Sequence, residues 1–145
     1  MAHRHELTDE QWSTLVRALP KRKGPESVIG DRAFINANLY RAKTGCPWRD
    51  LPERYGPWKT VYNRFNRWSH SGIWAKVLKA LRRSKKPRLD RKKYRKRYRV
   101  EVFFHDIKRF RAVATRFEKR ARHYLSVVQL VSALLWLAPQ DAVAS

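Results

Sequence analysis

Apolar side chains in the first half of the chain recur every three or four residues, which is the spacing of helices that bury one face. Thr8 and Gln11 form a capping-box pattern, so we expect a first helix that starts there and runs to Pro20. We expect a second helix to end near Gly45, a short third helix to open at Pro47, and two more helices to follow. The apolar positions that support the first, second and fifth helices are Trp12, Leu15, Val16, Leu19, Phe34, Ile35, Leu39, Ala42, Ile73, Trp74, Val77, Leu78 and Leu81.

The fourth predicted helix begins near Trp58, after Gly56 and Pro57 break the third, and its two faces differ in chemistry. Its apolar stripe consists of Trp58, Val61, Tyr62, Phe65 and Trp68. Two short helices joined by a tight glycine-containing turn are the skeleton of a helix-turn-helix. We therefore predict DNA contacts from the polar side of this helix, with protein binding by the same bundle as the alternative. The predicted DNA-binding residues are Lys59, Thr60, Asn63, Arg64, Asn66 and Arg67, with Asn63 or Arg64 reading a base.

A basic stretch separates the second half of the chain from the first. Between Arg82 and Lys93 the helical periodicity disappears and charge accumulates, which places a junction at 84–93 between a helical domain at 1–83 and a C-terminal segment at 94–145. In that segment we expect one helix over 94–108, a short link, and a last helix opened by the capping box of Thr115 and Glu118. The last helix carries Trp136 and either packs on the N-terminal helices or leaves an exposed apolar patch. The predicted fold class is all-α.

The composition adds a strong charge imbalance to this helical pattern. The chain has 145 residues, with 34 Lys and Arg against 12 Asp and Glu and a formal net charge of +22. An excess of this size predicts a polyanionic partner, and the six Trp, six Tyr and six Phe supply a core that holds the charge on a defined surface, so we expect nucleic acid. The apolar run from Leu125 to Ala138 is shorter than the roughly 20 residues that span a bilayer, so no membrane partner is expected.

Cysteine and histidine usage predicts neither a disulfide nor a zinc site. The single cysteine, Cys46, excludes an internal disulfide and suits a reducing cytoplasm. The N-terminus enters an amphipathic helix without the pattern of a signal peptide. No metal-ligand cluster with Cys46 is expected from the histidines, which are His3, His5, His70, His105 and His123.

One carboxylate stands in a basic row in the second half of the chain. On a helix, Tyr94, Arg97, Glu101 and Lys108 fall within an arc of roughly 60°, about a quarter-turn from the centre of an apolar stripe. The row therefore borders a buried face, as residues that line a cleft do. Glu101 is expected to stay ionised between Arg97 and Lys108, either as part of a surface salt-bridge ladder or as a ligand of a hard divalent cation. The stripe consists of Val100, Phe103, Phe104, Ile107 and Phe110.

The spacing of this row resembles a family signature. It matches the Y-(2)-R-(3)-E-(6)-K pattern of bacterial insertion-sequence transposases of the DDE type. The stretch FRAVATRFEKRARHYLSVVQLVSALLWL is similar to the C-terminus of transposases of the insertion-sequence-five family. The stretches LTDEQW, YRAKTGCPWRDLPERYGPWKTVYNRFNRW and GIWAKVLKAL are similar to the N-terminal helical domain of the same family. The resemblance thus covers nearly the whole chain.

The resemblance implies a site that is incomplete. It would make Glu101 the third metal-binding carboxylate of an RNase H-like domain that uses two Mg²⁺ ions, with Lys108, Arg97 and Tyr94 positioning DNA phosphates or supporting the glutamate. The family's two aspartates lie on strands between the two segments found here, and that region is missing. The resemblance therefore implies two C-terminal helices left from an internally deleted catalytic domain, with no Mg²⁺ held by this chain alone.

Three functions remain open at this stage. The chain is expected to bind the terminal inverted repeats of an insertion sequence in the bacterial cytoplasm, associated with the nucleoid, as part of DNA-mediated transposition. It could retain catalysis if a partner chain supplies the missing aspartates, or it could act without catalysis as a regulator or inhibitor of transposition. The third reading is a decayed remnant that folds poorly. Full-length transposase and a second copy of this chain are the expected protein partners.

Overall fold

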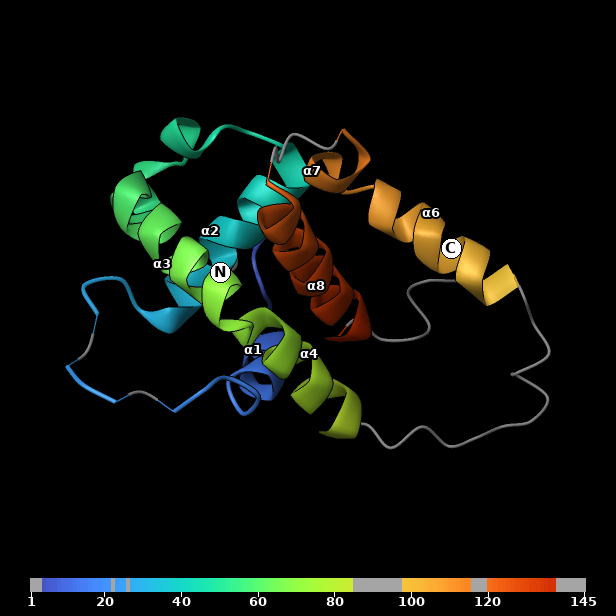
Figure 1. Cartoon of the computed structure of the whole chain (residues 1–145), viewed down its shortest axis with the longest axis horizontal. Coiled ribbons are helices and arrows are strands. Elements are labelled where there is room, and N and C mark those ends of the chain that lie inside the picture. Colours follow the sequence, from blue (N-terminus) through green and yellow to red (C-terminus); the bar gives the residue numbers. More distant parts are fainter. Residues whose placement is uncertain (1–3, 22, 26, 85–97, 116–119, 138–145) are drawn as a thin grey trace.

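The protein is an assembly of helices connected by turns and loops (Figure 1). The computed structural model describes residues 4–21, 23–25, 27–84, 98–115 and 120–137. Within these residues every regular element is helical, which confirms the predicted all-α class. The elements are α1 (Asp9–Leu15), α2 (Asp31–Thr44), the 3₁₀ turns η1 (Trp48–Asp50) and η2 (Glu53–Tyr55), α3 (Trp58–Ser71), α4 (Ile73–Ser84), α6 (Tyr98–Lys108), α7 (Arg111–Ala114) and α8 (Ala121–Leu137).

Helix α1 starts with the predicted capping box. The Gln11 amide donates to Thr8 Oγ1 over 3.2 Å, and the Thr8 amide donates to Gln11 Oε1 over 3.0 Å. The helix ends at Leu15 and not at Pro20, so the predicted C-terminal end was wrong. A proline disfavours the α conformation of the residue before it, and the chain tightens into turns in which Leu19 donates to the Val16 carbonyl.

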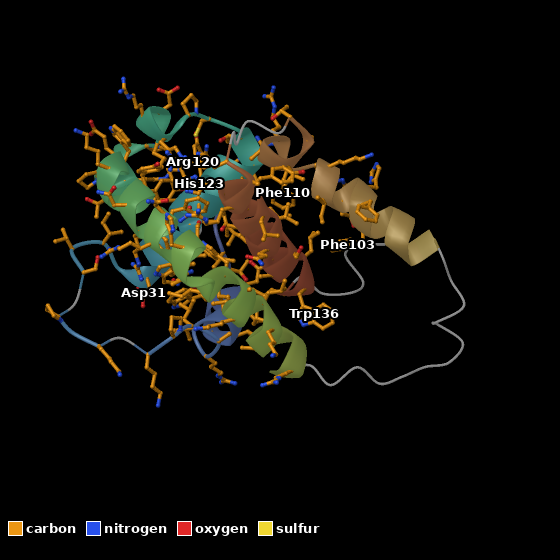
Figure 2. The ribbon with its side chains drawn as sticks, in the orientation of Figure 1. Asp31, Phe103, Phe110, Arg120, His123 and Trp136 are labelled. Carbon is orange, nitrogen blue, oxygen red and sulfur yellow. The ribbon has the colours of Figure 1, made fainter. Side chains whose placement is uncertain are left out.

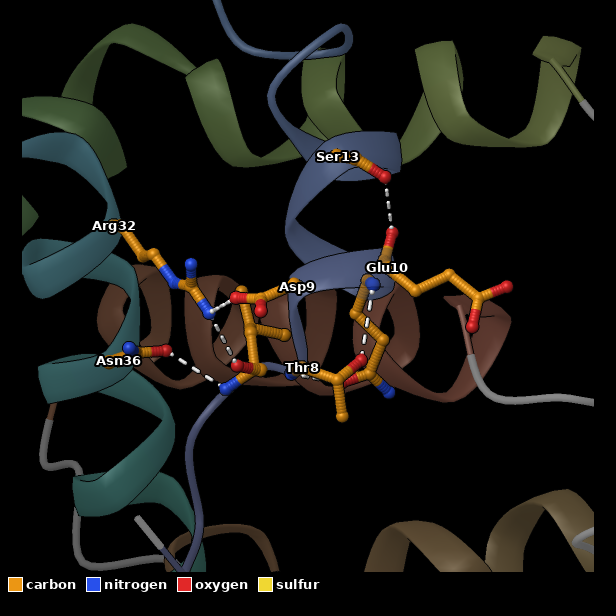
Figure 3. A network of polar contacts seen from close by, with 8 residues as sticks. Thr8, Asp9, Glu10, Ser13, Arg32 and Asn36 are labelled. Atoms are coloured by element: carbon orange, nitrogen blue, oxygen red, sulfur yellow. Dashed lines mark hydrogen bonds and ion pairs between the residues drawn. The ribbon is translucent and has the colours of Figure 1, made fainter. Parts of the chain in front are cut away.

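The segment before α1 is attached to α2 by polar contacts (Figure 3). The Leu7 amide donates to Asn36 Oδ1 over 3.0 Å, while Arg32 donates to the Leu7 carbonyl over 3.1 Å and pairs with Asp9 at 2.6 Å. Asn36 is buried, and a buried polar group that is left unpaired costs about 1–3 kcal/mol, so these bonds fix the register of the N-terminal segment on α2.

Helix α2 ends where predicted, but the expected third helix is wrong in type. Gly45 closes α2 in the left-handed conformation, with φ of 71°, as a C-terminal glycine cap does. The residues after Pro47 form the two 3₁₀ turns η1 and η2 in place of one short α-helix. Pro52 explains the break, because Leu51 before it is extended, with φ −62° and ψ 131°.

One hydrophobic core joins the two halves of the chain. Phe34, Trp68 and Trp74 form an aromatic group in which the centroids of the two indole rings lie 5.0 Å apart. Helix α8 runs alongside α4 and also contacts α2 and α3 (Figure 1). Of the two predicted fates of the last helix, packing on the N-terminal helices is the one observed.

Trp136 ties the end of α8 to α4, because its indole nitrogen donates to the Leu81 carbonyl over 3.2 Å. In Figure 2, Trp136 and His123 lie near opposite ends of α8. The predicted junction at 84–93 lies outside the described residues except for Ser84, so the proposed domain limits stay a prediction.

Two expectations for the second half of the chain were wrong. Thr115 does not open the last helix; it follows α7, and its hydroxyl donates back to the Arg111 carbonyl over 2.5 Å. Glu118, the other residue of that predicted capping box, lies outside the described residues. The apolar stripe of α6 is only partly covered, because Phe103 and Phe104 are 40% and 57% exposed. Helix α6 extends away from the bundle, and only its C-terminal end meets the other helices (Figure 1).

None of the helices, within the part of the chain that is described, is long and apolar enough to cross a membrane.

Candidate nucleic-acid interface

Helix α3 presents an exposed row of polar and cationic side chains. Lys59, Thr60, Asn63 and Arg67 are all exposed, as the sequence pattern predicted. The opposite side is anchored in the core by Val61 and other apolar residues. With 14 residues, α3 is about 21 Å long, and the row from Lys59 to Arg67 extends over roughly two of its turns. This row can offer one amide, one hydroxyl and two cations to a partner from a rigid helix.

The ends of α3 are defined by residues that fix its backbone. Pro57 precedes the first turn with φ of −61°, where the missing N–H of proline costs nothing. Gly72 closes the helix in the left-handed conformation, with φ of 69°, and its amide donates to the Trp68 carbonyl. The exposed row therefore stands on a helix that cannot extend in either direction.

Arg64 does not belong to the exposed row, and its predicted place on the polar side was wrong. The residue is only 7% exposed, and its guanidinium forms an ion pair with Asp31. The guanidinium carbon lies 4.3 Å from the ring centroid of Phe34 and 5.0 Å from that of Trp68. Arg64 follows Val61 by three residues and precedes Trp68 by four, so helical geometry places it on the buried face. The prediction placed Arg64 on the polar side because it is charged, whereas its position along the helix determines which face it occupies.

Asn66 stands at the edge of the exposed row and is half-buried by a contact with α8. His123 Nε2 lies 2.8 Å from Asn66 Oδ1, so the ring N–H donates to the amide oxygen. Three residues further along each helix, the Ser126 hydroxyl donates to Ser69 Oγ over 2.8 Å. The four residues form what we call the α3–α8 polar seam, and Figure 2 shows His123 on α8 facing the α3 side of the bundle. The matching three-residue spacing of polar residues on both helices was the sequence signal that could have revealed it.

Further cations surround the first turn of α3. Arg49 and Lys59 are exposed, and their charged groups each lie 5.8 Å from the ring centroid of Trp58. Arg54 on η2 is exposed as well, but it pairs with Glu6 at 3.4 Å and contacts the Tyr55 ring. Sequence reasoning missed Arg49. Its signal is an arginine in a turn directly after a tryptophan, close to the start of the polar helix.

The structure tests little of the predicted catalytic row. Tyr94 and Arg97 lie outside the described residues, and Glu101 lies on α6 with its side chain undescribed. Lys108 is exposed in the last turn of α6. The row therefore stays a prediction.

The described residues do not fit a two-metal centre. Asp106 lies 3.9 Å from both Arg109 and His105, so this carboxylate already has a cationic neighbour in Arg109. No group of three or more His, Cys, Asp or Glu residues in the described ranges could hold a metal ion. Two Mg²⁺ ions require several oxygen donors that converge on one point, and this donor set does not supply them.

Residues 7–78 match the model of a protein family described as "Putative transposase of IS4/5 family". This N-terminal segment, just under half of the chain, is similar to that family. The matched IS4/5 segment begins at the buried Leu7 and covers α1, α2, both 3₁₀ turns, α3 and half of α4, so it includes the exposed row.

Three curated proteins resemble parts of this chain. "Uncharacterized protein y4sN" of Sinorhizobium fredii is 36% identical over 81 residues, which is 53% of this chain and 63% of that protein. "Putative transposase for insertion sequence element IS6501" of Brucella ovis is 38% identical over 55 residues, or 38% of this chain and 42% of that protein. "Insertion element IS402 uncharacterized 16.2 kDa protein" of Burkholderia cepacia is 30% identical over 79 residues, or 49% and 54%. The chain thus spans about half the length of these relatives, and no solved structure matches it.

Proposed function

We propose that the chain is a transposase of the IS4/5 type that binds the terminal inverted repeats of an insertion sequence through α3, as part of DNA-mediated transposition. The observation that carries the proposal is the exposed row of Lys59, Thr60, Asn63 and Arg67 on one rigid helix within the segment that is similar to this family. The net charge of +22 supports binding to nucleic acid, and it acts on any DNA sequence.

The chemistry of the row supports sequence reading as well as charge attraction. The major groove of B-DNA is about 12 Å wide and admits one α-helix. Asn63 stands in the middle of the row, and an asparagine side chain can pair with both adenine N6 and N7. Lys59 and Arg67 stand one turn before and one turn after it, where cations reach phosphates on either side of a groove. In this proposal α3 acts as the recognition helix of a helix-turn-helix whose preceding element is built from 3₁₀ turns.

The experiment measures binding of the full chain to a duplex from an end of the parent element and to a scrambled duplex at several salt concentrations. We expect Asn63→Ala to lower the preference for the element end by about 1–3 kcal/mol, because it removes one base contact. Lys59→Ala is expected to weaken the binding of both duplexes equally. It should also reduce by about 1 the slope of the logarithm of the binding constant against the logarithm of the salt concentration. Lys79→Ala, on the exposed side of α4, removes the same charge and serves as the matched control.

Either of two results contradicts the proposal. One is equal, steeply salt-dependent binding of both duplexes by the wild-type chain, which would mean that the net charge acts alone. The other is an unchanged preference for the element end in Asn63→Ala, which would place the sequence reading elsewhere.

The proposal includes no DNA cleavage by this chain alone, because the described donor set does not fit two metal ions. The chain would then occupy element ends without cutting them and so regulate or inhibit full-length transposase on nucleoid DNA. A supercoiled plasmid that carries two element ends provides the test, with Mg²⁺ or Mn²⁺ present. Nicking by this chain alone contradicts the proposal. Nicking only in a mixture with a chain that contains the missing region would show catalysis completed by a partner.

A further inference from the structure

A cavity of about 670 Å³ lies on a part of the surface that includes no residue of α3. It is open to solvent, and it is bordered by the segment before α1, by α1, by the last turn of α2, by the end of α6 and by the last turns of α8. Its size falls within the roughly 300–1,000 Å³ of small-molecule sites in proteins. The lining residues that matter here are Arg4, His5, Lys43, Phe110, Leu134 and Leu135.

One wall of the cavity is cationic and lacks matching carboxylates. Neither Arg4 nor Lys43 forms an ion pair or hydrogen bond within the described part of the chain. Glu6, which also lines the cavity, already accepts the Tyr55 hydroxyl at 2.8 Å and pairs with Arg54. Asp106 lies 3.9 Å from Arg109, which is a second pair at the rim. The two cations without partners therefore leave an excess of positive charge at this wall.

Electrostatic effects on two neighbouring side chains agree with this excess. Burial lowers the pKa of the Lys43 ammonium, which means that its charge is poorly compensated by its surroundings. Burial also lowers the pKa of the His5 imidazole, and the charges of Lys43, Arg4 and Arg54 lower it further. An anion in the cavity would oppose each of these effects.

The backbone at His5 is strained where it borders the cavity. His5 has φ of 80°, in the left-handed region, which costs a residue with a Cβ roughly 1–2 kcal/mol. Strain of this kind persists where the surrounding structure enforces it, and it is found most often at binding sites. The ring of His5 packs edge-on against Tyr40, with centroids 6.2 Å apart, so the strained segment is also held in place.

The other wall is apolar. Phe110 is buried, and Leu134 and Leu135 on α8 are half-buried, so the residues that border the cavity on this side are apolar. A ligand that fills both walls needs an anionic group at one end and a flat apolar group at the other. We propose that this cavity binds a nucleoside monophosphate, with the phosphate at Arg4 and Lys43 and the base against Phe110 and Leu134. This inference is independent of the duplex contacts proposed for α3.

The test titrates the full chain with deoxyadenosine monophosphate by calorimetry, with deoxyadenosine and inorganic phosphate as the two halves of the ligand. We expect saturable binding of the monophosphate and weaker binding of each half. Arg4→Gln and Lys43→Gln should each lower the affinity about tenfold, because each removes a charged hydrogen-bond donor. Lys79→Gln removes an equal charge outside the cavity and should leave the affinity unchanged. Because Arg4 is exposed, its variant tests the site even if Lys43→Gln alters the fold.

The ligand could be a free nucleotide or the terminal nucleotide of a DNA strand, and titrations with two DNA duplexes distinguish these sources. A blunt duplex is compared with a duplex that carries one unpaired nucleotide with a 5′-phosphate. Tighter binding of the second duplex, lost in Arg4→Gln, would identify the terminal nucleotide of a DNA strand as the ligand. Monophosphate binding without that difference would identify a free nucleotide.

Asn63→Ala separates this inference from the proposed function, since it should leave the monophosphate titration unchanged. The proposal is overturned if the wild-type chain binds neither the monophosphate nor the unpaired end, or if Lys79→Gln weakens binding as much as Arg4→Gln.

Discussion

The guanidinium of Arg64 exchanges its water shell for two aromatic rings and one carboxylate. Such a group is costly to bury, and the contacts with Phe34, Trp68 and Asp31 offset this cost only while all of them are present. Arg64 lies on α3, the helix proposed to contact DNA, but its side chain is on the face that packs against the start of α2. Its contribution to DNA binding is therefore expected to be indirect, through the position of α3.

We predict that Arg64→Ala lowers the free energy of unfolding by about 3 kcal/mol, the lower end for a broken buried pair, because the Asp31 side chain is 34% exposed. Urea unfolding followed by tryptophan fluorescence measures this loss. Arg67→Ala is the matched control, and it should change stability by less than about 0.5 kcal/mol because Arg67 is exposed. An Arg64→Ala chain with wild-type stability that still loses its preference for the element end would return Arg64 to the interface.

Tyr55 gives a prediction about alkaline pH. The pKa of its phenol is raised from 10.0 to about 12, mainly by burial, with the hydrogen bond to Glu6 adding to the rise and Arg54 opposing it. The folded state therefore keeps a proton that the unfolded state releases near pH 10, so this contribution to stability is complete below pH 10 and is lost as the pH rises towards about 12.

Tyr55→Phe removes this contribution. Between pH 9 and about 12 we expect the free energy of unfolding of the wild-type chain to fall more steeply than that of the variant. Parallel curves for the two chains over this range would show that the phenol titrates alike in the folded and unfolded states.

At the scale of elements, the α3–α8 polar seam aligns the proposed recognition helix on the core. Asn66 bonds to His123 and Ser69 bonds to Ser126, so both pairs specify one register between the two helices. Apolar contacts alone would allow α3 and α8 to slide against each other by small amounts. A shift that separates the hydrogen-bonded side chains costs a desolvation penalty.

A double-mutant cycle tests the seam. Asn66→Ala and His123→Ala should each lower the free energy of unfolding by roughly 0.5–1.5 kcal/mol or more, because each removes the hydrogen bond between the two side chains. The double variant should lose less than the sum, since the pair is then absent from both sides. Asn63→Ala, one turn earlier and exposed, is the control for removal of an asparagine from α3. Strictly additive losses would show that the two side chains are not coupled.

The elements that sequence could predict are those whose ends are coded locally. The capping box at Thr8, the glycine caps at Gly45 and Gly72 and the proline before α3 all act within a few residues, and the structure contains each of them. The exposed row of α3 also follows from local periodicity. What sequence could not supply depends on partners far along the chain, such as the burial of Arg64 beside Phe34 and the hydrogen bond of Asn66 to His123 on α8. Thr115 shows the same limit, because a threonine can close one helix as well as open another.

At the scale of the whole molecule, the first half of the chain depends on the last helix. Val131 on α8 is 0% exposed and belongs to the same cluster as Trp74, Val77 and Leu81 on α4. Helix α8 therefore completes the core on which α3 rests, although it lies outside the matched segment at 7–78.

We predict that Val131→Asp abolishes the cooperative unfolding transition, including the signal of Trp68 and Trp74, because an uncompensated buried carboxylate costs several kcal/mol out of a typical total of about 5–15. Leu125→Asp places the same group on the same helix at a side chain that is 54% exposed, and it should stay close to wild type. Retention of a cooperative transition in Val131→Asp would show that the N-terminal helices fold without α8. Absence of such a transition in the wild-type chain would favour a decayed remnant.

The pairing of α4 with α8 also bears on how chain length can change between relatives. The entropy lost when two helices meet grows only with the logarithm of the length of chain between them, so each doubling costs about 0.6 kcal/mol. The contacts of α8 with α4, including the Trp136 bond to Leu81, outweigh increments of this size. A long insertion after Ser84 would therefore leave the helical bundle almost as stable as a short connection does. A domain can therefore be gained or lost between α4 and α6 with little change in the stability of the helical bundle.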